Sequence, residues 1–256
     1  MPSSPHRDAV TYDRISGPLE RIGNEVLGRL ELAGDETVLD AGCGSGRVTQ
    51  GLVARLPRGR VICVDGSPEM LAVARDRLGP AVEYVLQDLA DLELGGRLVD
   101  AVLSTATLHW LPDHPRVFAR LRAVLRPGGR LVAQCGGTGN TAELVAAAGT
   151  VGDREPFDVH LGGWPGPWNF VGPGETTARL RDAGFTDVSA WLVRRPAPYD
   201  ELGEWLRANA LTAHLERLPV GLREPFVEAV AAELGRDPEI SYIRLNIDAA
   251  RPPGEA

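Results

Sequence analysis

Short apolar runs alternate with amphipathic, helix-like stretches along the first half of the chain. Apolar runs of this length between turn residues are typical of buried strands, and the expected strands are 37–41, 60–64, 82–86, 99–104 and 130–135. Apolar residues at helical spacing predict helices at 18–32, 47–56, 67–78 and 115–125. Regular alternation of strand and helix predicts a parallel sheet covered on both faces, with a ligand site at the carboxyl ends of its strands.

The pattern changes after residue 136, where the expected helices and strands are 143–148, 176–183, 188–193, 199–234 and 242–247. The segment 152–174 is rich in glycine, proline, tryptophan and phenylalanine, which predicts a long loop. Its aromatic side chains need a surface on which to pack. We therefore expect a lid loop, 153–172, to fold with a helical cap, 199–236, over the strand ends and to form the acceptor pocket.

Composition limits the classes of protein that fit this pattern. The chain has 256 residues, 43% of them hydrophobic and 24% charged, which is ordinary for a soluble globular protein. The formal charge of -8 argues against nucleic acid as a partner, and no apolar run is long enough for a membrane span. The N-terminus carries no visible signal peptide, so we expect a cytoplasmic protein.

Two residue types limit the chemistry. All 27 basic residues are arginine, which excludes a lysine Schiff base and a P-loop lysine. The three cysteines, Cys43, Cys63 and Cys135, form no CxxC pair, which argues against a thiolate zinc site and a disulfide framework. We therefore expect no metal in the site.

A glycine-rich loop follows the first expected strand and precedes a helix. It runs from Asp40 to Gly46 as DAGCGSG, and glycines at such a junction let the backbone approach a ligand closely. A dinucleotide fingerprint requires a third glycine where Arg47 stands, which disfavours a dinucleotide oxidoreductase. Asp65 and Asp88 end the next two strands, where carboxylates can accept hydrogen bonds from ribose hydroxyls and an adenine amino group. Together these features predict a nucleoside site.

These motifs resemble those of class I S-adenosylmethionine-dependent methyltransferases. The matching segments are Asp40 to Gly46, Val64 to Met70, Gln87-Asp88-Leu89 and Leu125 to Gly129. More narrowly, the chain resembles the trans-aconitate methyltransferase-like group, through Tyr12-Asp13, Leu108 to Asp113, Val132 to Gly137, Pro167 to Phe170 and Tyr242 to Asn246. The resemblance covers nearly the whole chain.

The resemblance implies an α/β fold with a doubly wound, Rossmann-like sheet of seven strands, mostly parallel and with the last strand antiparallel. A helical cap is expected between strands six and seven. The chain, 1–256, would form a single methyltransferase domain. Its expected parts are an N-terminal helical segment (1–33), a cofactor-binding core (36–136) and an acceptor half (137–256).

The implied cofactor is S-adenosylmethionine. Gly42 and Gly44 would lie under its methionine part, and Asp40 would contact the amino group. Ser104 and Thr105, at the end of the fourth strand, would face the sulfonium. The full set of residues expected to bind the cofactor is Tyr12, Asp40, Gly42, Gly44, Asp65, Gly66, Met70, Asp88, Leu89, Ser104 and Thr105.

The acceptor side of the site has weaker signals. His109 is the leading candidate for a general base because it follows the fourth strand, although His109 and Trp110 could instead be a packing motif. The side chains expected at the acceptor are His109, Trp110, Trp164 and Trp168. Arginines at three positions either bind an anionic acceptor or are solvated or structural: Arg194, Arg195 and Arg244. His114 is expected at the surface.

The predicted function is methyl transfer to a small-molecule acceptor, either a carboxylic acid or a specialised metabolite. The alternative is a non-catalytic S-adenosylmethionine-binding protein, which the intact glycine loop and strand-end acids disfavour. We expect no partner beyond the small-molecule acceptor, neither nucleic acid nor membrane. The expected assembly is a monomer or a weak homodimer.

Overall fold

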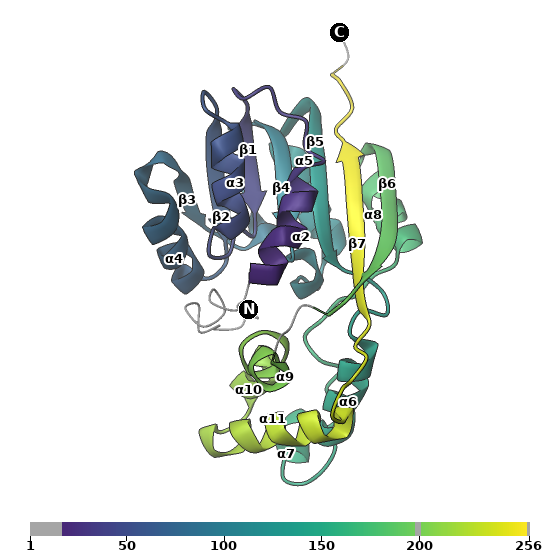
Figure 1. Ribbon diagram of the computed structural model, residues 1–256. Coiled ribbons are helices and arrows are strands. Elements are labelled where there is room, and N and C mark those ends of the chain that lie inside the picture. Colours follow the sequence, from purple (N-terminus) through teal and green to yellow (C-terminus); the bar gives the residue numbers. More distant parts are fainter. Residues whose placement is uncertain (1–16, 198–200, 255–256) are drawn as a thin grey trace.

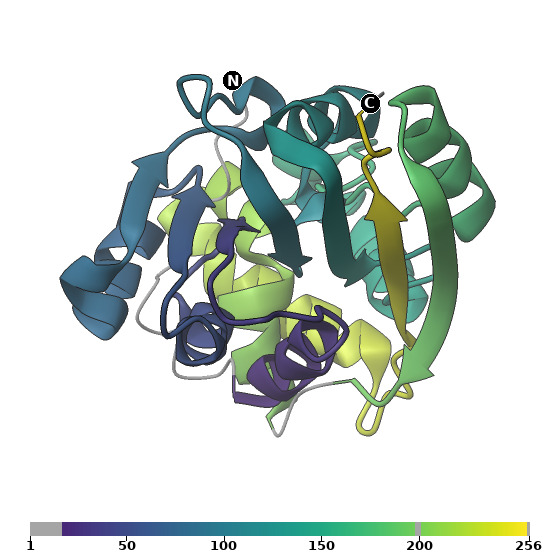
Figure 2. The same cartoon turned by 90° about the horizontal axis from the view of Figure 1, so that it is seen from above.

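The described residues form one seven-stranded sheet with helices on both faces (Figure 1, Figure 2). A computed structural model describes residues 17–197 and 201–254, so Tyr12 lies outside the described residues. The strands are β1 (Thr37–Ala41), β2 (Arg60–Asp65), β3 (Glu83–Leu86), β4 (Val99–Thr105), β5 (Leu125–Gly136), β6 (Thr186–Arg195) and β7 (Tyr242–Ala250). Their order across the sheet is β3-β2-β1-β4-β5-β7-β6.

The sheet is parallel from β3 to β5, and β7 runs antiparallel to both of its neighbours, β5 and β6. The prediction of a mostly parallel, seven-stranded sheet with an antiparallel last strand is therefore confirmed. Strand β1 lies between β2 and β4, so successive connections depart in opposite directions on either side of it. Parallel sheets open a crevice at the carboxyl ends of the strands at such a point.

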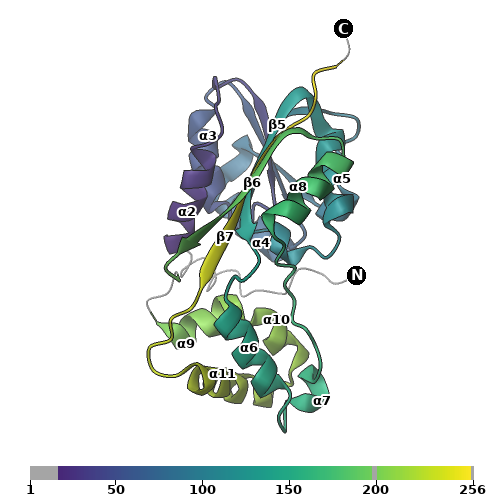
Figure 3. The same ribbon diagram turned by 90° about the vertical axis from the view of Figure 1, so that its right-hand side faces the viewer.

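Helices cover both faces of this sheet (Figure 3), and an apolar cluster lies on each face. One face packs on α2 (Gly17–Leu27) and α3 (Arg47–Arg55), with Val26 and Leu52 buried against Leu103 of β4. Helix α4 (Pro68–Leu78) packs beside α3. The opposite face packs on α5 (His114–Val124) and α8 (Pro173–Asp182), whose Phe118 and Leu180 belong to the largest buried cluster. The two helical layers exclude water from both faces of the sheet and leave the ends of its strands uncovered.

A helical cap lies beyond the carboxyl ends of the parallel strands (Figure 1). Between β6 and β7 it contains α9 (Leu202–Trp205), the π-helical turn η4 (Leu206–Ala210), α10 (Thr212–Arg217) and α11 (Val220–Leu234). This placement confirms the predicted cap between strands six and seven, whose expected first residues fall partly in the undescribed 198–200. The cap also includes α6 (Ala142–Gly152) and α7 (Asp158–Leu161), which precede β6 and share its apolar cluster.

The structure differs from the sequence predictions in several details. Helix α2 ends at Leu27 rather than at residue 32, because Gly28 and Arg29 continue as turns and the Arg29 side chain reaches β5 and β7. The expected loop 152–174 contains α7. His114 is buried rather than at the surface, with its Nε2 2.8 Å from the carbonyl oxygen of Leu108.

Candidate functional site

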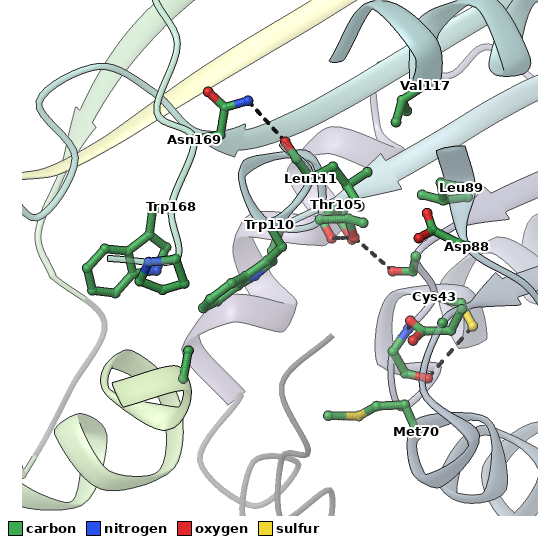
Figure 4. A pocket seen from close by; sticks show the side chains of 18 of the residues that line it. Cys43, Met70, Asp88, Leu89, Thr105, Trp110, Leu111, Val117, Trp168 and Asn169 are labelled. Carbon is green, nitrogen blue, oxygen red and sulfur yellow. Dashed lines mark hydrogen bonds between the residues drawn. The ribbon is translucent and has the colours of Figure 1, made fainter. Parts of the chain in front are cut away.

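A cavity of about 1020 Å³ lies between the carboxyl ends of the parallel strands and the cap. Met70, Cys43 and Asp88 stand at one end of it and Trp110 and Trp168 at the other (Figure 4). We call the part built by the segments after β1, β2, β3 and β4 the cofactor wall. The part built by residues 110–117, the loop 162–172, α10, Gln134 and Arg244 is called the acceptor wall.

The glycine loop after β1 has a backbone conformation that only glycine adopts readily. Gly42, Gly44 and Gly46 have φ of 79°, 55° and 79°, in the left-handed region. A Cβ at Gly42 would lie 2.2 Å from Cγ2 of Thr107, so any side chain there would also collide with the loop after β4. The exposed backbone at Gly42 and Gly44 is therefore open to a ligand in the cavity.

Asp65, the last residue of β2, connects two of these loops. One carboxylate oxygen accepts the N–H of Gly44 at 2.8 Å, and the other accepts the N–H of Ser67 at 2.9 Å. The side chain lines the cavity and is only partly buried. Each carboxylate oxygen has two lone pairs, so a carboxylate at this position can accept more than one hydrogen bond, which suits a diol.

Asp40 and Ser104 lie beneath the cofactor wall rather than on it. Asp40 is 1% exposed and accepts a hydrogen bond from the Thr49 hydroxyl at 2.7 Å, while its other oxygen has no partner. Burial, with the nearby charge of Asp65, raises the pKa of Asp40 to about 7. The Ser104 hydroxyl donates to the carbonyl oxygen of Ala41 at 2.7 Å. The expected direct contacts of both residues with the cofactor do not fit these positions, because neither lines the cavity.

The far end of the cofactor wall presents apolar surface with one acid at its edge. Met70, Leu86 and Leu89 line it, and Leu86 is 57% exposed although it is apolar. Asp88 caps the short helix η2 (Leu89–Asp91) by accepting the N–H of Ala90 at 2.8 Å. A flat, apolar ring with polar edge groups fits such a surface. Gly66 also lines the cavity here.

Aromatic rings form much of the acceptor wall, which includes Trp110, Trp164 and Trp168. Trp168 stacks on Phe170 with ring centroids 5.8 Å apart and planes at 9°. Asn169 fastens this loop to the segment after β4: its N–H donates to the carbonyl of His109 at 2.8 Å, and its side chain donates to that of Leu111 at 3.0 Å. The tryptophans are thereby held at the cavity.

His109 does not line the cavity among the described residues. Its side chain is 7% exposed, and its Nδ1 accepts the backbone N–H of Gly136 at 3.2 Å. A ring nitrogen that accepts an N–H carries no proton, so the neutral ring is protonated on Nε2 and has no second lone pair to offer as a base. The ring also stacks on Phe170, with centroids 5.8 Å apart. This geometry favours the packing interpretation of His109.

Several cavity residues were not predicted as part of the site. Thr107 supports the glycine loop, with its hydroxyl 3.0 Å from the carbonyl oxygen of Gly42. Gln134 of β5 lines the acceptor wall, and Arg217 lies on α10 at its rim. No local sequence signal marks Thr107 or Arg217, whereas Gln134 is a polar residue in the otherwise apolar run 131–135. Of the arginines considered from the sequence for an anionic acceptor, Arg244 lines the same wall from β7, whereas Arg194 and Arg195 do not line the cavity.

The cofactor wall fits S-adenosylmethionine. The exposed backbone at Gly42 suits the methionine part, and the carboxylate of Asp65 suits a ribose. The apolar surface at Met70 and Leu86 suits an adenine ring. No group of three or more histidine, cysteine, aspartate or glutamate side chains that could hold a metal ion occurs within residues 17–197 and 201–254. In the same part of the chain, no helix is long and apolar enough to cross a membrane.

The chain is similar to known methyltransferases. Residues 38–129 match a family model described as a methyltransferase domain. Trans-aconitate 2-methyltransferase of Variovorax paradoxus is 31% identical over 226 residues, which cover 84% of each chain. The enzyme of the same name from Azoarcus is 30% identical and covers 97% of this chain and 92% of its own.

Solved structures show the same fold. A phosphoethanolamine N-methyltransferase of Haemonchus contortus, in complex with S-adenosyl-L-methionine, has a TM-score of 0.65 and 20% identity, covering 95% of this chain and 56% of its own. An S-adenosylmethionine-dependent methyltransferase of Mesorhizobium loti has a TM-score of 0.56 and 22% identity, covering 93% of this chain and 100% of its own.

The fold and the site define an S-adenosylmethionine-dependent methyltransferase of the Rossmann-like class, with S-adenosylmethionine as its cofactor. Within that class, the chain belongs to the family that contains the trans-aconitate methyltransferases.

Proposed function

We propose that the enzyme methylates a carboxylate oxygen of a small organic acid and forms a methyl ester. One observation carries this proposal: the described residues that line the cavity include no histidine and no tyrosine, and the chain has no lysine. Phenol, alcohol and amine acceptors profit from a general base, and these side chains are the usual ones besides carboxylates. An acceptor that is already an anion needs none.

Three of the acidic side chains at the cavity are engaged in other ways. Glu20 pairs with Arg47 at 2.9 Å, and Asp91 forms an ion pair with Arg116. Asp113 accepts the backbone N–H of Arg116 at 3.0 Å, at the start of α5. Each of these carboxylates therefore already has a partner within the chain. This arrangement supports an acceptor that needs no deprotonation.

The chain's own residues then have to bind and align rather than move a proton. When bound, S-adenosylmethionine supplies a methyl group on a cationic sulfur, and its transfer to a carboxylate forms one C–O bond, breaks one C–S bond and releases no proton. Proximity and exclusion of water are the main contributions left to the protein. The aromatic acceptor wall serves both purposes, because Trp110, Trp164 and Trp168 are rigid and apolar.

The roles within the site follow the same division. Gly42, Gly44 and Gly66 give the cofactor close access to the backbone, Asp65 holds the ribose, and Thr105 faces the transferred methyl group. Met70, Asp88 and Leu89 bind the adenine. Residues 36–136 thus supply most of the cofactor half, and residues 137–256 supply most of the acceptor half, including the lid loop and the cap.

The relatives give independent support for a carboxylic acid acceptor. The similar enzymes of Variovorax paradoxus and Azoarcus carry trans-aconitate in their names, and both cover most of this chain. An acid of this kind is an anion at neutral pH. The proposed acceptor is therefore a small unsaturated di- or tricarboxylate.

The test is a methyl-transfer assay across acceptor classes. The enzyme is incubated with labelled S-adenosylmethionine and trans-aconitate, a phenol or a primary amine, and the product is identified by mass spectrometry. We expect a methyl ester from the acid only. Turnover should rise with ionisation of the acid and then stay level to pH 8. Methylation of the phenol or the amine alone would refute the proposal.

A further inference from the structure

Arg244 is a buried cation at the cavity with no carboxylate beside it. It lies on β7, is 3% exposed and lines the acceptor wall. None of the ion pairs among residues 17–197 and 201–254 involves it. Its contacts there are Oε1 of Gln134, 3.4 Å from Nε, and the ring of Tyr242, 4.9 Å from the guanidinium carbon. A charge buried in this way is costly unless an anion pairs with it.

A chain of hydrogen bonds fixes the surroundings of Arg244. Nη1 of Arg29 donates to Oδ1 of Asn246 at 2.5 Å, and Nε2 of Gln134 donates to the same oxygen at 2.9 Å. Arginine has only donors, so Asn246 must present its oxygen to Arg29. Gln134 must therefore turn its amide nitrogen toward Asn246 and its oxygen toward Arg244. The network thus has a cation at each end and two amides between them, and within the described part of the chain none of these hydrogen bonds gives Arg244 an anionic partner.

We propose that Arg244 is an anion subsite that binds a non-reacting carboxylate of the acceptor, with Gln134, Asn246 and Arg29 as positioning residues. The proposal rests on the proposed function, because it assigns a second carboxylate to the acid. The reacting carboxylate loses its charge on esterification, so a cation beside it would favour the ground state over the transition state. A carboxylate that does not react keeps its charge, and its pairing with Arg244 persists throughout methyl transfer.

The other arginine of the acceptor wall, among the described residues, is less suited to the task. Arg217 stands at the rim on α10 and is exposed, with its guanidinium carbon 4.4 Å from the ring of Trp164. Water and salt screen an exposed charge, whereas a buried guanidinium can form a strong bidentate pair with a carboxylate. Arg244 is therefore the residue expected to discriminate between acids by their number of carboxylates.

The test combines one variant with a set of acids. Arg244→Gln removes the charge, and trans-aconitate is compared with mesaconate, glutaconate and itaconate, each of which lacks a different one of its three carboxylates. For trans-aconitate we expect KM to rise about 10- to 100-fold, as for loss of a charge-assisted pair. For the one analogue that lacks the carboxylate bound by Arg244, KM should change less than about twofold, because its partner is already missing.

Two further variants separate charge from structure. Gln134→Glu places a carboxylate beside Arg244 and should raise KM for trans-aconitate in the same range, although the arginine is still present. Arg194→Gln makes the matched substitution on β6, where Arg194 pairs with Glu239 outside the cavity, and should leave KM unchanged. Affinity for S-adenosylhomocysteine, measured by calorimetry, reports in each variant whether the fold is intact.

A binding measurement distinguishes this proposal from the proposed function. With S-adenosylhomocysteine present, trans-aconitate should raise Tm of the wild type and not that of Arg244→Gln. If acids are methylated but Arg244→Gln raises KM for all of them equally or for none, the anion subsite is wrong and the proposed function stands. If trans-aconitate binds through Arg244 without being methylated, the subsite stands and the proposed function is wrong. If no acid either binds or reacts, both are wrong.

Discussion

The cofactor wall and the acceptor wall enclose one cavity but are built in different ways. The cofactor wall uses backbone groups and short side chains in the segments that directly follow β1, β2, β3 and β4, all within residues 42–107. The acceptor wall uses large side chains from segments far apart in sequence, such as Trp110, Trp168 and Arg244. Its position depends on contacts such as those of Asn169 with the segment after β4.

The difference matches the two ligands that the walls have to bind. A common cofactor can be held by backbone geometry, which tolerates changes elsewhere in the sequence. An acceptor is distinguished by its shape and charge, which a wall of exchangeable side chains on loops and cap helices can match. The walls should therefore respond separately to substitution.

The largest effect is expected on the cofactor wall, for Asp65→Ala. The substitution removes a charged acceptor for the ribose and releases the N–H groups of Gly44 and Ser67, 2.8 and 2.9 Å away. At about 1.5–3 kcal/mol for each charge-assisted hydrogen bond, affinity for S-adenosylhomocysteine should fall about 100-fold or more in calorimetry.

The matched control for Asp65→Ala is Asp153→Ala. Asp153 is exposed in the lid loop and also accepts a backbone N–H, from Gly163 at 2.9 Å, but it does not line the cavity. Its loss should leave the affinity within about twofold, because surface substitutions have small effects. Equal affinity losses in both variants would mean that Asp65 acts through loop structure alone.

The cofactor wall and the acceptor wall also differ in how far they could be predicted from the sequence. Gly42 and Asp65 lie in short motifs whose spacing follows from strand–loop–helix geometry, so the parallel sheet and the segments at its strand ends could be predicted. Arg244 could be named but not placed, because its environment depends on Gln134, Asn246 and Arg29, which come from three distant segments. Pairings of this kind arise only in the folded chain.

Local patterns also gave two incorrect expectations on the acceptor side. His114 looks like a surface residue at a helix start, yet tertiary contacts with Leu108 and Arg179 bury it. The segment 152–174 looks like a loop because glycine and proline are frequent, whereas it contains α7, and Phe157 and Leu161 pack into the cap. Packing against distant residues overrode propensity in both places.

The second largest effect concerns the pH dependence of the cap. Burial, with the charge of Arg217, lowers the pKa of His214 from its usual 6.5 to about 4. The neutral ring is thus favoured by folding, so stability is fully present above pH 6.5 and is lost as pH falls toward 4. At pH 5 the loss should be about 2 kcal/mol relative to pH 8.

His214→Phe should remove this loss, because Nδ1 has no hydrogen-bond partner and the ring mainly packs on Trp164 and Phe226. Chemical denaturation at pH 5 and pH 8 measures the difference in the free energy of unfolding. The control is His160→Phe, at a partly exposed site on α7, where the pH dependence should remain as in the wild type. A His214→Phe variant with unchanged pH dependence would show that the buried histidine is not the cause.

The third effect tests the acceptor wall directly, with Trp168→Ala. The variant removes the ring that stacks on Phe170 and lines the cavity. KM for the acceptor should rise about tenfold, since aromatic pairs contribute about 0.5–1.5 kcal/mol in addition to the apolar area that they bury. Affinity for S-adenosylhomocysteine should change less than about twofold. Trp168→Phe retains a ring and should recover most of the loss, and an equal fall in affinity for both ligands would contradict the separation of the walls.

The smallest effect on turnover is expected for His109, which stands behind the acceptor wall. His109→Asn retains an acceptor for the N–H of Gly136, whereas His109→Phe retains the ring but leaves that buried N–H without a partner. The unfolding free energy should therefore fall by about 1–3 kcal/mol in the phenylalanine variant and less in the asparagine variant. Turnover with saturating acid should stay within about threefold of the wild type in both. A general base would instead lose about 10²- to 10⁴-fold in both variants, and such a loss would restore His109 to the catalytic site.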